Sequence, residues 1–138
     1  MKQLTIRLKS GQLLKEEIER KASDIKAGVL LSIVGNLENA VLRMTGSKAD
    51  NQIVKQWDGP FEIVSGTGTI SKEGCHIHIS LADREGNVIG GHLKRGCKVK
   101  YTAEIVIGIF EDATYKRVLD KATGFKELKV KYGNSRAI

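Results

Sequence analysis

The sequence predicts an α+β fold, a mainly antiparallel β-sheet of about seven or more strands with one main amphipathic helix. Two observations support this prediction. Apolar and polar residues alternate in many short segments separated by glycine-containing turns, a pattern typical of hairpin-connected strands. One early segment instead repeats its apolar residues at helical spacing. The 138 residues fit a single domain, 1–138, that is long enough to bury its own core.

The elements follow in order along the chain. Residues 1–9 are predicted to form a strand, because Leu4 and Leu8 fall on the same face. The next segment, 12–26, is predicted to be a helix that ends near Gly28. The Gly59-Pro60 pair is expected to separate two strands. Strands are expected at 29–34, 39–44, 51–56, 61–65, 75–81, 88–93, 98–110, 115–118 and 126–130.

Charge favours an anionic partner without identifying it. The chain holds 23 Lys and Arg against 16 Asp and Glu, a net charge of +7, and residues 93–138 carry +6 of it. Four basic residues around the turn at Gly96 are candidates for DNA or anion contact: Lys94, Arg95, Lys98 and Lys100. They could equally form a solvated face. No helix-turn-helix, zinc-finger or basic-zipper pattern accompanies them, so DNA would be bound by non-specific electrostatics.

Composition also predicts the cellular compartment of the protein. No window approaches the roughly 20 apolar residues that a membrane-spanning helix needs. The first residues alternate instead of forming the hydrophobic core of a signal peptide. Two cysteines are too few for a disulfide framework, so the expected compartment is the reducing cytoplasm, with no membrane partner.

All three histidines fall within one short stretch. In the segment 75–81, His76 and His78 alternate with apolar residues and therefore share one face of a strand. A three-residue loop, 84–86, with a left-handed Gly86 would place His92 opposite His78. Side chains directly opposite each other have Cβ atoms about 4.5–5.5 Å apart. The turn chemistry therefore predicts three imidazoles on one face.

Three convergent imidazoles suit a divalent metal, and zinc is the expected ion. Three ligands leave one position for water, as in catalytic zinc sites, or for another ligand. Glu104 is the candidate for a residue that orients a histidine or acts as a base, although a salt bridge or oligomer contact would also explain it. Ordinary hydrogen-bonded histidines are the alternative, and a bulge at Gly90-Gly91 would turn His92 to the other face.

Several short motifs occur in a fixed order along the chain: Gly28–Ser32, Gly35–Leu37, Gly59–Ser65, Gly68–Ile70, His76–His78, Gly90–Leu93, Thr102–Glu104 and Thr123–Leu128. Together these motifs resemble the plant-and-prokaryote-conserved (PPC) domain over roughly residues 3–131. The resemblance implies a compact domain that assembles as a homotrimer and takes part in DNA-associated regulation. It also implies metal binding by the residues that match His76, His78 and His92.

The plant family uses a Gly-Arg-Phe-Glu-Ile-Leu segment for partner contacts, and the matching positions here run from Gly59 to Val64. The resemblance therefore implies a partner or oligomer interface at Gly59, Phe61, Glu62 and Ile63. Plant members reach DNA through an Arg-Gly-Arg-Pro arm, which this sequence lacks. Three functions stay open: a DNA-binding or regulatory homotrimer with a three-histidine metal site, a metal-dependent enzyme or small-ligand sensor, and an assembly module. Whether the protein is an enzyme is undecided, with a non-enzymatic role favoured.

Overall fold

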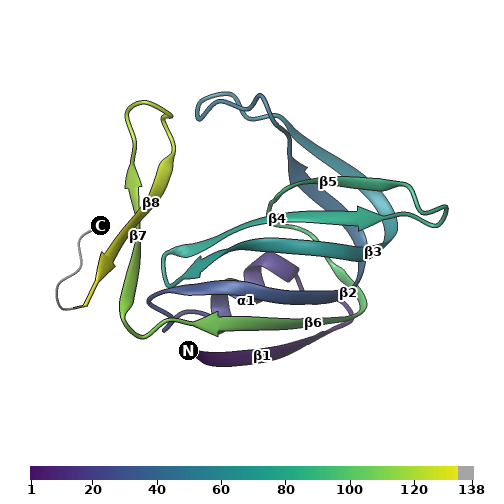
Figure 1. Ribbon diagram of the computed structural model, residues 1–138. Coiled ribbons are helices and arrows are strands. Elements are labelled where there is room, and N and C mark those ends of the chain that lie inside the picture. Colours follow the sequence, from purple (N-terminus) through teal and green to yellow (C-terminus); the bar gives the residue numbers. More distant parts are fainter. Residues whose placement is uncertain (134–138) are drawn as a thin grey trace.

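Six strands form one antiparallel sheet in the computed structural model, which describes residues 1–133. These strands are β1 (Lys2–Lys9), β2 (Gly28–Arg43), β3 (Val54–Ser71), β4 (Gly74–Ala82), β5 (Val88–Leu93) and β6 (Val99–Ile109). Their order across the sheet is β1-β6-β2-β3-β4-β5 (Figure 1). A second hairpin of β7 (Ala113–Leu119) and β8 (Lys126–Tyr132) brings the described strands to eight. The predicted α+β class is confirmed.

The sheet also closes on itself at one end, because the last residues of β2 pair with β5. Leu42 lies opposite Leu93, and Arg43 lies opposite His92. Strands β2, β3, β4 and β5 therefore form a closed curve at this end, while β6 and β1 extend the sheet as open strands. This closure brings the end of β2 beside the histidine-bearing strands.

Two of the predicted strand breaks are wrong. Segments 29–34 and 39–44 are parts of the single strand β2, and segments 51–56 and 61–65 lie largely within β3. The Gly59-Pro60 pair does not interrupt β3, because pairing with β2 continues on both sides of it, at Asp58 and at Phe61. Pairing with neighbouring strands holds these segments together where the local sequence favours a turn. Register shifts in β2 and β3 absorb the irregularity.

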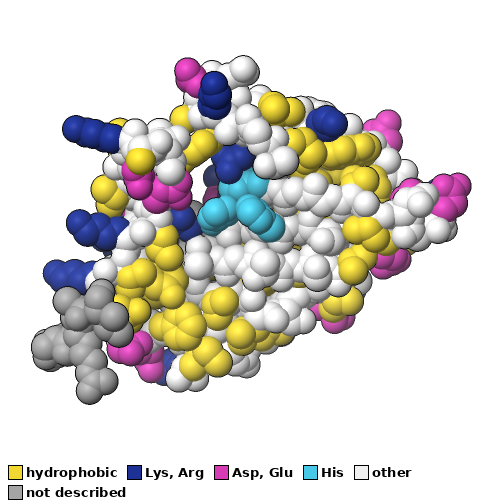
Figure 2. All heavy atoms as spheres, turned by 45° about the horizontal axis from the view of Figure 1, so that its top comes forward, with side chains coloured by type: hydrophobic (Ala, Val, Ile, Leu, Met, Phe, Trp, Pro, Cys, Tyr) yellow, Lys and Arg dark blue, Asp and Glu magenta, His cyan; other side chains and the backbone are white. Residues whose placement is uncertain are grey.

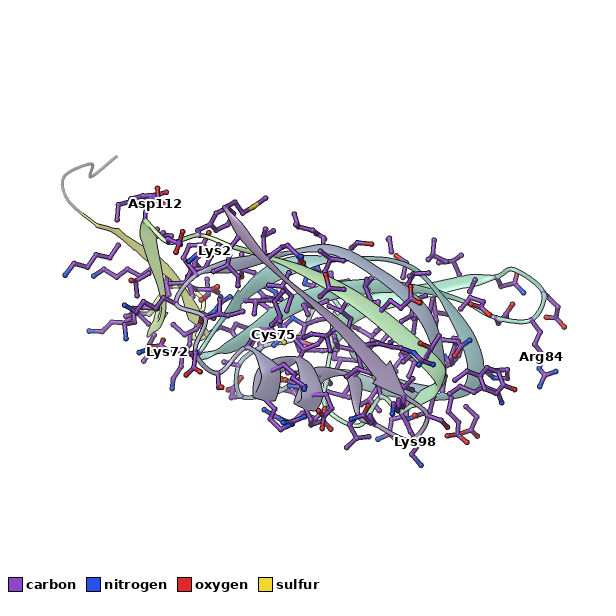
Figure 3. The ribbon with its side chains drawn as sticks, turned by 90° about the horizontal axis from the view of Figure 1, so that it is seen from below. Lys2, Lys72, Cys75, Arg84, Lys98 and Asp112 are labelled. Atoms are coloured by element: carbon purple, nitrogen blue, oxygen red, sulfur yellow. The ribbon has the colours of Figure 1, made fainter. Side chains whose placement is uncertain are left out.

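The helix is shorter than predicted. Helix α1 spans Leu14–Lys21, and Leu14 and Ile18 are buried. Gly28 begins β2 instead of ending the helix, and it pairs with β3 and β6 at once. A Cβ at Gly28 would lie 2.9 Å from a backbone oxygen of β6, so this glycine allows two strands to approach closely. Figure 3 shows α1 lying against one face of the sheet.

The core lies between this helix and the inward face of the sheet. Strand β4 contributes every second residue to it, and both free cysteines, Cys75 and Cys97, are buried there. Within residues 1–133, the structure has no helix with the length and apolar character needed to cross a membrane.

The β7–β8 hairpin docks against the turn between β3 and β4. The Glu73 carboxylate accepts hydrogen bonds from the Lys116 ammonium at 2.9 Å and from the Arg117 backbone N–H at 2.6 Å. The Arg117 guanidinium also donates to the Thr69 hydroxyl at 2.7 Å. In Figure 3, Lys72 lies close to this hairpin, whereas Arg84 lies at the opposite tip of the molecule. Docking places the hairpin loop beside the histidines.

Candidate metal centre

The turn between β4 and β5 sets the register of the histidines. The Asp83 carboxylate accepts the Asn87 backbone N–H at 2.9 Å, and the Asp83 N–H donates to the Asn87 carbonyl at the same distance. Gly86 has a φ of 83°, the left-handed conformation that the loop requires. Pairing then runs without a shift to His78 opposite His92. The predicted register is therefore confirmed.

The glycine pair in β5 does not form the bulge that would have turned His92 away. A Cβ at Gly90 would lie 2.9 Å from the backbone oxygen of Ile79, and a Cβ at Gly91 would lie 2.9 Å from that of Arg43. The two glycines therefore let β5 lie close to β4 on one side and to β2 on the other. Close packing of backbones, not a bulge, explains both residues.

The three imidazoles converge on one face. One nitrogen from each of His76, His78 and His92 lies within 4.8 Å of the other two. The Nε2 atoms of His76 and His78 are 3.2 Å apart. Imidazole nitrogens bound to one zinc ion at about 2.0–2.1 Å would lie about 3.3 Å apart, so the His76–His78 pair already has the spacing of two zinc ligands. Figure 2 shows the histidine side chains together at the surface of a hollow.

Burial and positive neighbours keep two of the rings neutral. Burial first, and then the Arg43 guanidinium, lower the pKa of His92 to about 3. The pKa of His76 is also lowered, again by burial and then by the positive charge that His78 can carry. Metals bind neutral imidazole, so both rings are in the protonation state that a metal ligand needs at neutral pH. The cluster therefore suits a metal through its uncharged nitrogen ligands, whereas the positive charge of Arg43 opposes any bound cation.

Hollows open on both sides of the histidines. One, of about 660 Å³, is lined by His78 and His92 and by hydroxyl side chains. These hydroxyl residues are Thr45, Ser47, Ser65, Thr67 and Ser80. The other hollow, of about 480 Å³, is lined by His76 and His92 and by charged residues from α1, from the β3–β4 turn and from the β7–β8 hairpin. Arg43 lines both hollows, so it lies next to the candidate metal position.

The structure does not bring Glu104 to the histidines. Glu104 is exposed on β6, opposite Arg7 of β1 and Val34 of β2. In the sheet order, β2 and β3 lie between β6 and β4. Only the strand order decides what lies beside this carboxylate, so the sequence pattern alone could not place it.

The segment expected at an interface lies on β3, where successive side chains point to opposite faces of the sheet. Phe61 and Ile63 are each 6% exposed and belong to the core of the single chain, so their side chains offer little surface to a partner. Glu62, between them, is exposed. Gly59 lies against the backbone of Glu38, where a Cβ would be 2.5 Å from the carbonyl oxygen. Glu62 alone of the four keeps an exposed side chain.

The four basic candidates do not form one patch. Lys94 lines the charged hollow beside the histidines, and Arg95 pairs with Glu19 of α1. Lys100 lines a different hollow together with Arg84 and Tyr101. Lys98 is exposed, and Figure 3 shows it apart from Cys75, at the other end of the helix. The turn at Gly96 points these side chains in different directions, because residues along a strand alternate between faces.

Sequence reasoning missed Arg43 and Phe125. The Arg43 guanidinium lies 3.1 Å from Nδ1 of His92 and 4.8 Å from the centre of the Phe125 ring. Arg43 ends β2 and reaches the site because β2 pairs with β5, whereas Phe125 comes from the loop of the docked hairpin. No local pattern signals either placement.

Comparisons with known proteins agree with this architecture. A family model described as the Plants and Prokaryotes Conserved (PCC) domain matches residues 1–111, which include all three histidines. Two relatives from Synechococcus strains, both named Bifunctional protein GlmU, are 38% identical over 127 residues. The match covers 91% of this chain and 20% of each relative, so the chain spans about a fifth of their length.

Solved structures share the fold across nearly the whole chain. A hypothetical protein from Salmonella superposes with a TM-score of 0.85 at 27% identity, covering 95% of this chain and 94% of that one. A protein from Archaeoglobus fulgidus described as metal-containing gives 0.79 at 28% identity, covering 94% of each chain.

A protein from Bacteroides thetaiotaomicron, described as a "putative DNA binding protein", gives a TM-score of 0.80 at 16% identity. The match covers 92% of this chain and 91% of that one. This likeness is one of fold. With the family model, the sheet order and the three-histidine cluster all in agreement with the resemblance in the sequence, the chain belongs to the Plants and Prokaryotes Conserved (PCC) domain family.

Proposed function

We propose that this domain binds one divalent metal ion through His76, His78 and His92, and that the ion is zinc. The observation that carries the proposal is the convergence of three ring nitrogens within 4.8 Å on one face of the β4–β5 hairpin. The ligand chemistry supports zinc, which three imidazoles and one open position suit. The metal-containing description of the Archaeoglobus fulgidus neighbour, at 28% identity, adds support.

Elemental analysis of the purified protein tests the proposal. Wild-type protein dialysed against zinc should hold one equivalent per chain, and His78→Ala should hold close to none. Val88→Thr is the matched control, because Val88 is exposed on the partner strand β5 and outside the cluster. A wild-type protein that stays metal-free after loading, or a His78→Ala variant with full metal content, would overturn the proposal.

Cobalt substitution identifies the coordination geometry. A four-coordinate cobalt site with three imidazoles should give strong visible absorption, whereas an octahedral site gives weak bands. Competition between zinc, manganese and magnesium for the apo-protein should follow the preference of imidazole for zinc. Tighter binding of magnesium than of zinc would contradict the assignment of the metal.

DNA binding is the second candidate function, and the excess of basic charge favours it. Five basic residues lie on the two strands of the β7–β8 hairpin: Lys116, Arg117, Lys126, Lys129 and Lys131. Lys129 and Lys131 fall on the same face of β8, so their positive charges add at one place. Binding through such a surface would be sensitive to salt and weakly selective for sequence. The DNA-binding description of the Bacteroides neighbour, which shares the fold, is consistent with this candidate.

Titration of a duplex at low and moderate salt tests DNA binding. Affinity should fall steeply as salt rises, and Lys129→Glu should weaken it at every salt concentration. Lys2→Glu is a control, because Lys2 lies on β1 and pairs with Glu111. Absence of binding even at low salt would overturn this function.

A homotrimer is proposed as the assembled form. The family resemblance supports it, as does a group of exposed apolar side chains on the sheet, which a second copy could cover. They are Leu31, Val34 and Val64. One chain has a mass of 15.2 kDa, and light scattering should give three times this value. A monomer at micromolar concentration would contradict the proposal.

A further inference from the structure

We propose that metal binding releases Arg43 from His92 and that the freed guanidinium then holds a small oxyanion, a carboxylate or phosphate group, as a co-ligand of the metal. This inference rests on the proposed metal site. It assigns Arg43 a role in binding and gives the open coordination position a class of ligand.

The first step is that Arg43 and a metal compete for the same ring. A guanidinium can only donate hydrogen bonds, so Nδ1 of His92, 3.1 Å from Arg43, must accept through its lone pair. A metal bound at Nδ1 would take that lone pair. A metal bound at Nε2 would leave the ring proton on Nδ1, facing a donor. In either case the Arg43–His92 hydrogen bond cannot coexist with a neutral His92 ligand.

The second step is that released Arg43 stays at the site. Its backbone is fixed opposite His92 by the β2–β5 pairing, and its guanidinium already lies over the Phe125 ring at 4.8 Å from the centroid. Residues Thr67, His78, His92 and Arg43 follow one another as paired positions across β3, β4, β5 and β2. A rotation about side-chain bonds therefore moves the guanidinium within the hollows that it lines.

The third step concerns the charge that the site would carry. Three neutral imidazoles leave the charge of a divalent metal uncompensated. Arg43 adds a further positive charge, and it forms no ion pair with a carboxylate among residues 1–133. Of the other cations that line the charged hollow, Lys15 pairs with Glu19 at 3.1 Å. Lys94, Arg117 and Lys126 form no ion pair among residues 1–133 and add to the positive charge. An anion is therefore the ligand that the loaded site would favour.

The chemistry of the hollow narrows the ligand to a small oxyanion. Carboxylate and phosphate oxygens can coordinate the open metal position and accept two parallel hydrogen bonds from one guanidinium. The hydroxyl groups of Ser65, Thr67 and Ser80 line the same 660 Å³ hollow and can bond further oxygens of the ligand. A purely apolar molecule would leave these groups and Arg43 without partners.

Calorimetry of zinc binding by the full chain tests the competition. Arg43→Gln should bind zinc up to about tenfold more tightly than wild type, because no guanidinium holds His92 and one positive charge is gone. Arg43→Lys should stay close to wild type, since the charge is kept. If Arg43→Gln loses zinc as His78→Ala does, Arg43 supports the site structurally and the competition is wrong.

Anion titration of the cobalt-loaded protein tests the co-ligand, with acetate and inorganic phosphate as probes and chloride at equal ionic strength as reference. Wild type should show a visible spectral shift at about tenfold lower anion concentration than Arg43→Gln. A response to acetate alone assigns a carboxylate, and a response to phosphate alone assigns a phosphate. Equal responses from both proteins, or none from wild type, overturn the inference. Failure of wild type to bind any metal would show instead that the proposed function itself is wrong.

Discussion

The two faces of strand β4 have different roles: the inner face packs into the core, and the outer face carries two of the candidate metal ligands. On the inner face, Cys75, Ile77, Ile79 and Leu81 are between 0 and 7% exposed and belong to the core. On the outer face, His76 and His78 alternate with them and remain open to a hollow. A single run of residues therefore serves both purposes, because successive side chains on a strand point to opposite faces.

The comparison indicates that the residue type can change on the outer face of β4 without loss of the fold, whereas on the inner face it cannot. Burial fixes the inner residues through their volume, since a tightly packed core does not tolerate gaps. The outer residues have few packing partners, so residue type there is open to selection for binding. The following predictions test this division, beginning with the largest expected effect.

Ile77→Ala should destabilise the fold by about 2–5 kcal/mol, because it removes a fully buried side chain and leaves a cavity. Chemical denaturation of the metal-free protein measures this change. Ile77→Val, which removes one methylene group, should cost about 0.5–1.5 kcal/mol and serves as the graded control. A loss below 1 kcal/mol for Ile77→Ala would mean that the inner face is less tightly packed than the structure indicates.

His78→Ala should remove metal binding while leaving the metal-free fold nearly unchanged, within about 0.5 kcal/mol. His78 is exposed on the outer face, so its removal leaves no cavity. With zinc at about 100 times the dissociation constant, wild type should gain about 2.7 kcal/mol of stability that the variant does not gain. Thermal unfolding with zinc and with a chelator measures both quantities. Equal stabilisation of the two proteins by zinc would contradict the assignment of metal binding to the outer face of β4.

Glu19→Gln should make the unfolding free energy less dependent on pH. Burial alone would raise the pKa of Glu19, but the Lys15 ammonium, the Cys75 N–H and the Arg95 guanidinium together hold it below its usual value of 4.5. A lowered pKa in the folded state adds stability above pH 4.5, and this stability is lost as pH falls through the folded-state value.

The difference in unfolding free energy between wild type and Glu19→Gln should therefore be largest near neutral pH. It should disappear as the pH falls below 4.5. Solvent screening limits it to less than about 1 kcal/mol. Denaturation at a series of pH values provides the measurement. A gap that widens toward acid would have the opposite sign and would contradict the assignment.

Val88→Thr should have the smallest effect, within about 0.5 kcal/mol, with full metal content. Val88 is 58% exposed at the far end of β5, and threonine keeps the β-branched shape that suits a strand. Denaturation and elemental analysis measure both quantities. A large loss would show that this exposed position is covered in the assembled protein.

Much of the candidate site could be predicted from sequence because its determinants are local. Alternation put His76 and His78 on one face, and the turn at Asp83–Asn87 fixed the partner of His78. The existence of the helix also followed from spacing. Its ends did not, because Leu13 bridges to Lys98 and Gly28 joins the sheet. These contacts lie beyond any local pattern.

The sequence by itself determined the class of the fold, the inner face of the strands and the meeting of three histidines across one hairpin. Only the tertiary structure decided which charged groups surround them. It excluded Glu104, which the strand order places on β6, and it supplied Arg43 from 49 residues away through the β2–β5 pairing. The physical reason is that a two-residue period and a short turn act between neighbours, whereas strand order and closure depend on how the whole sheet curves.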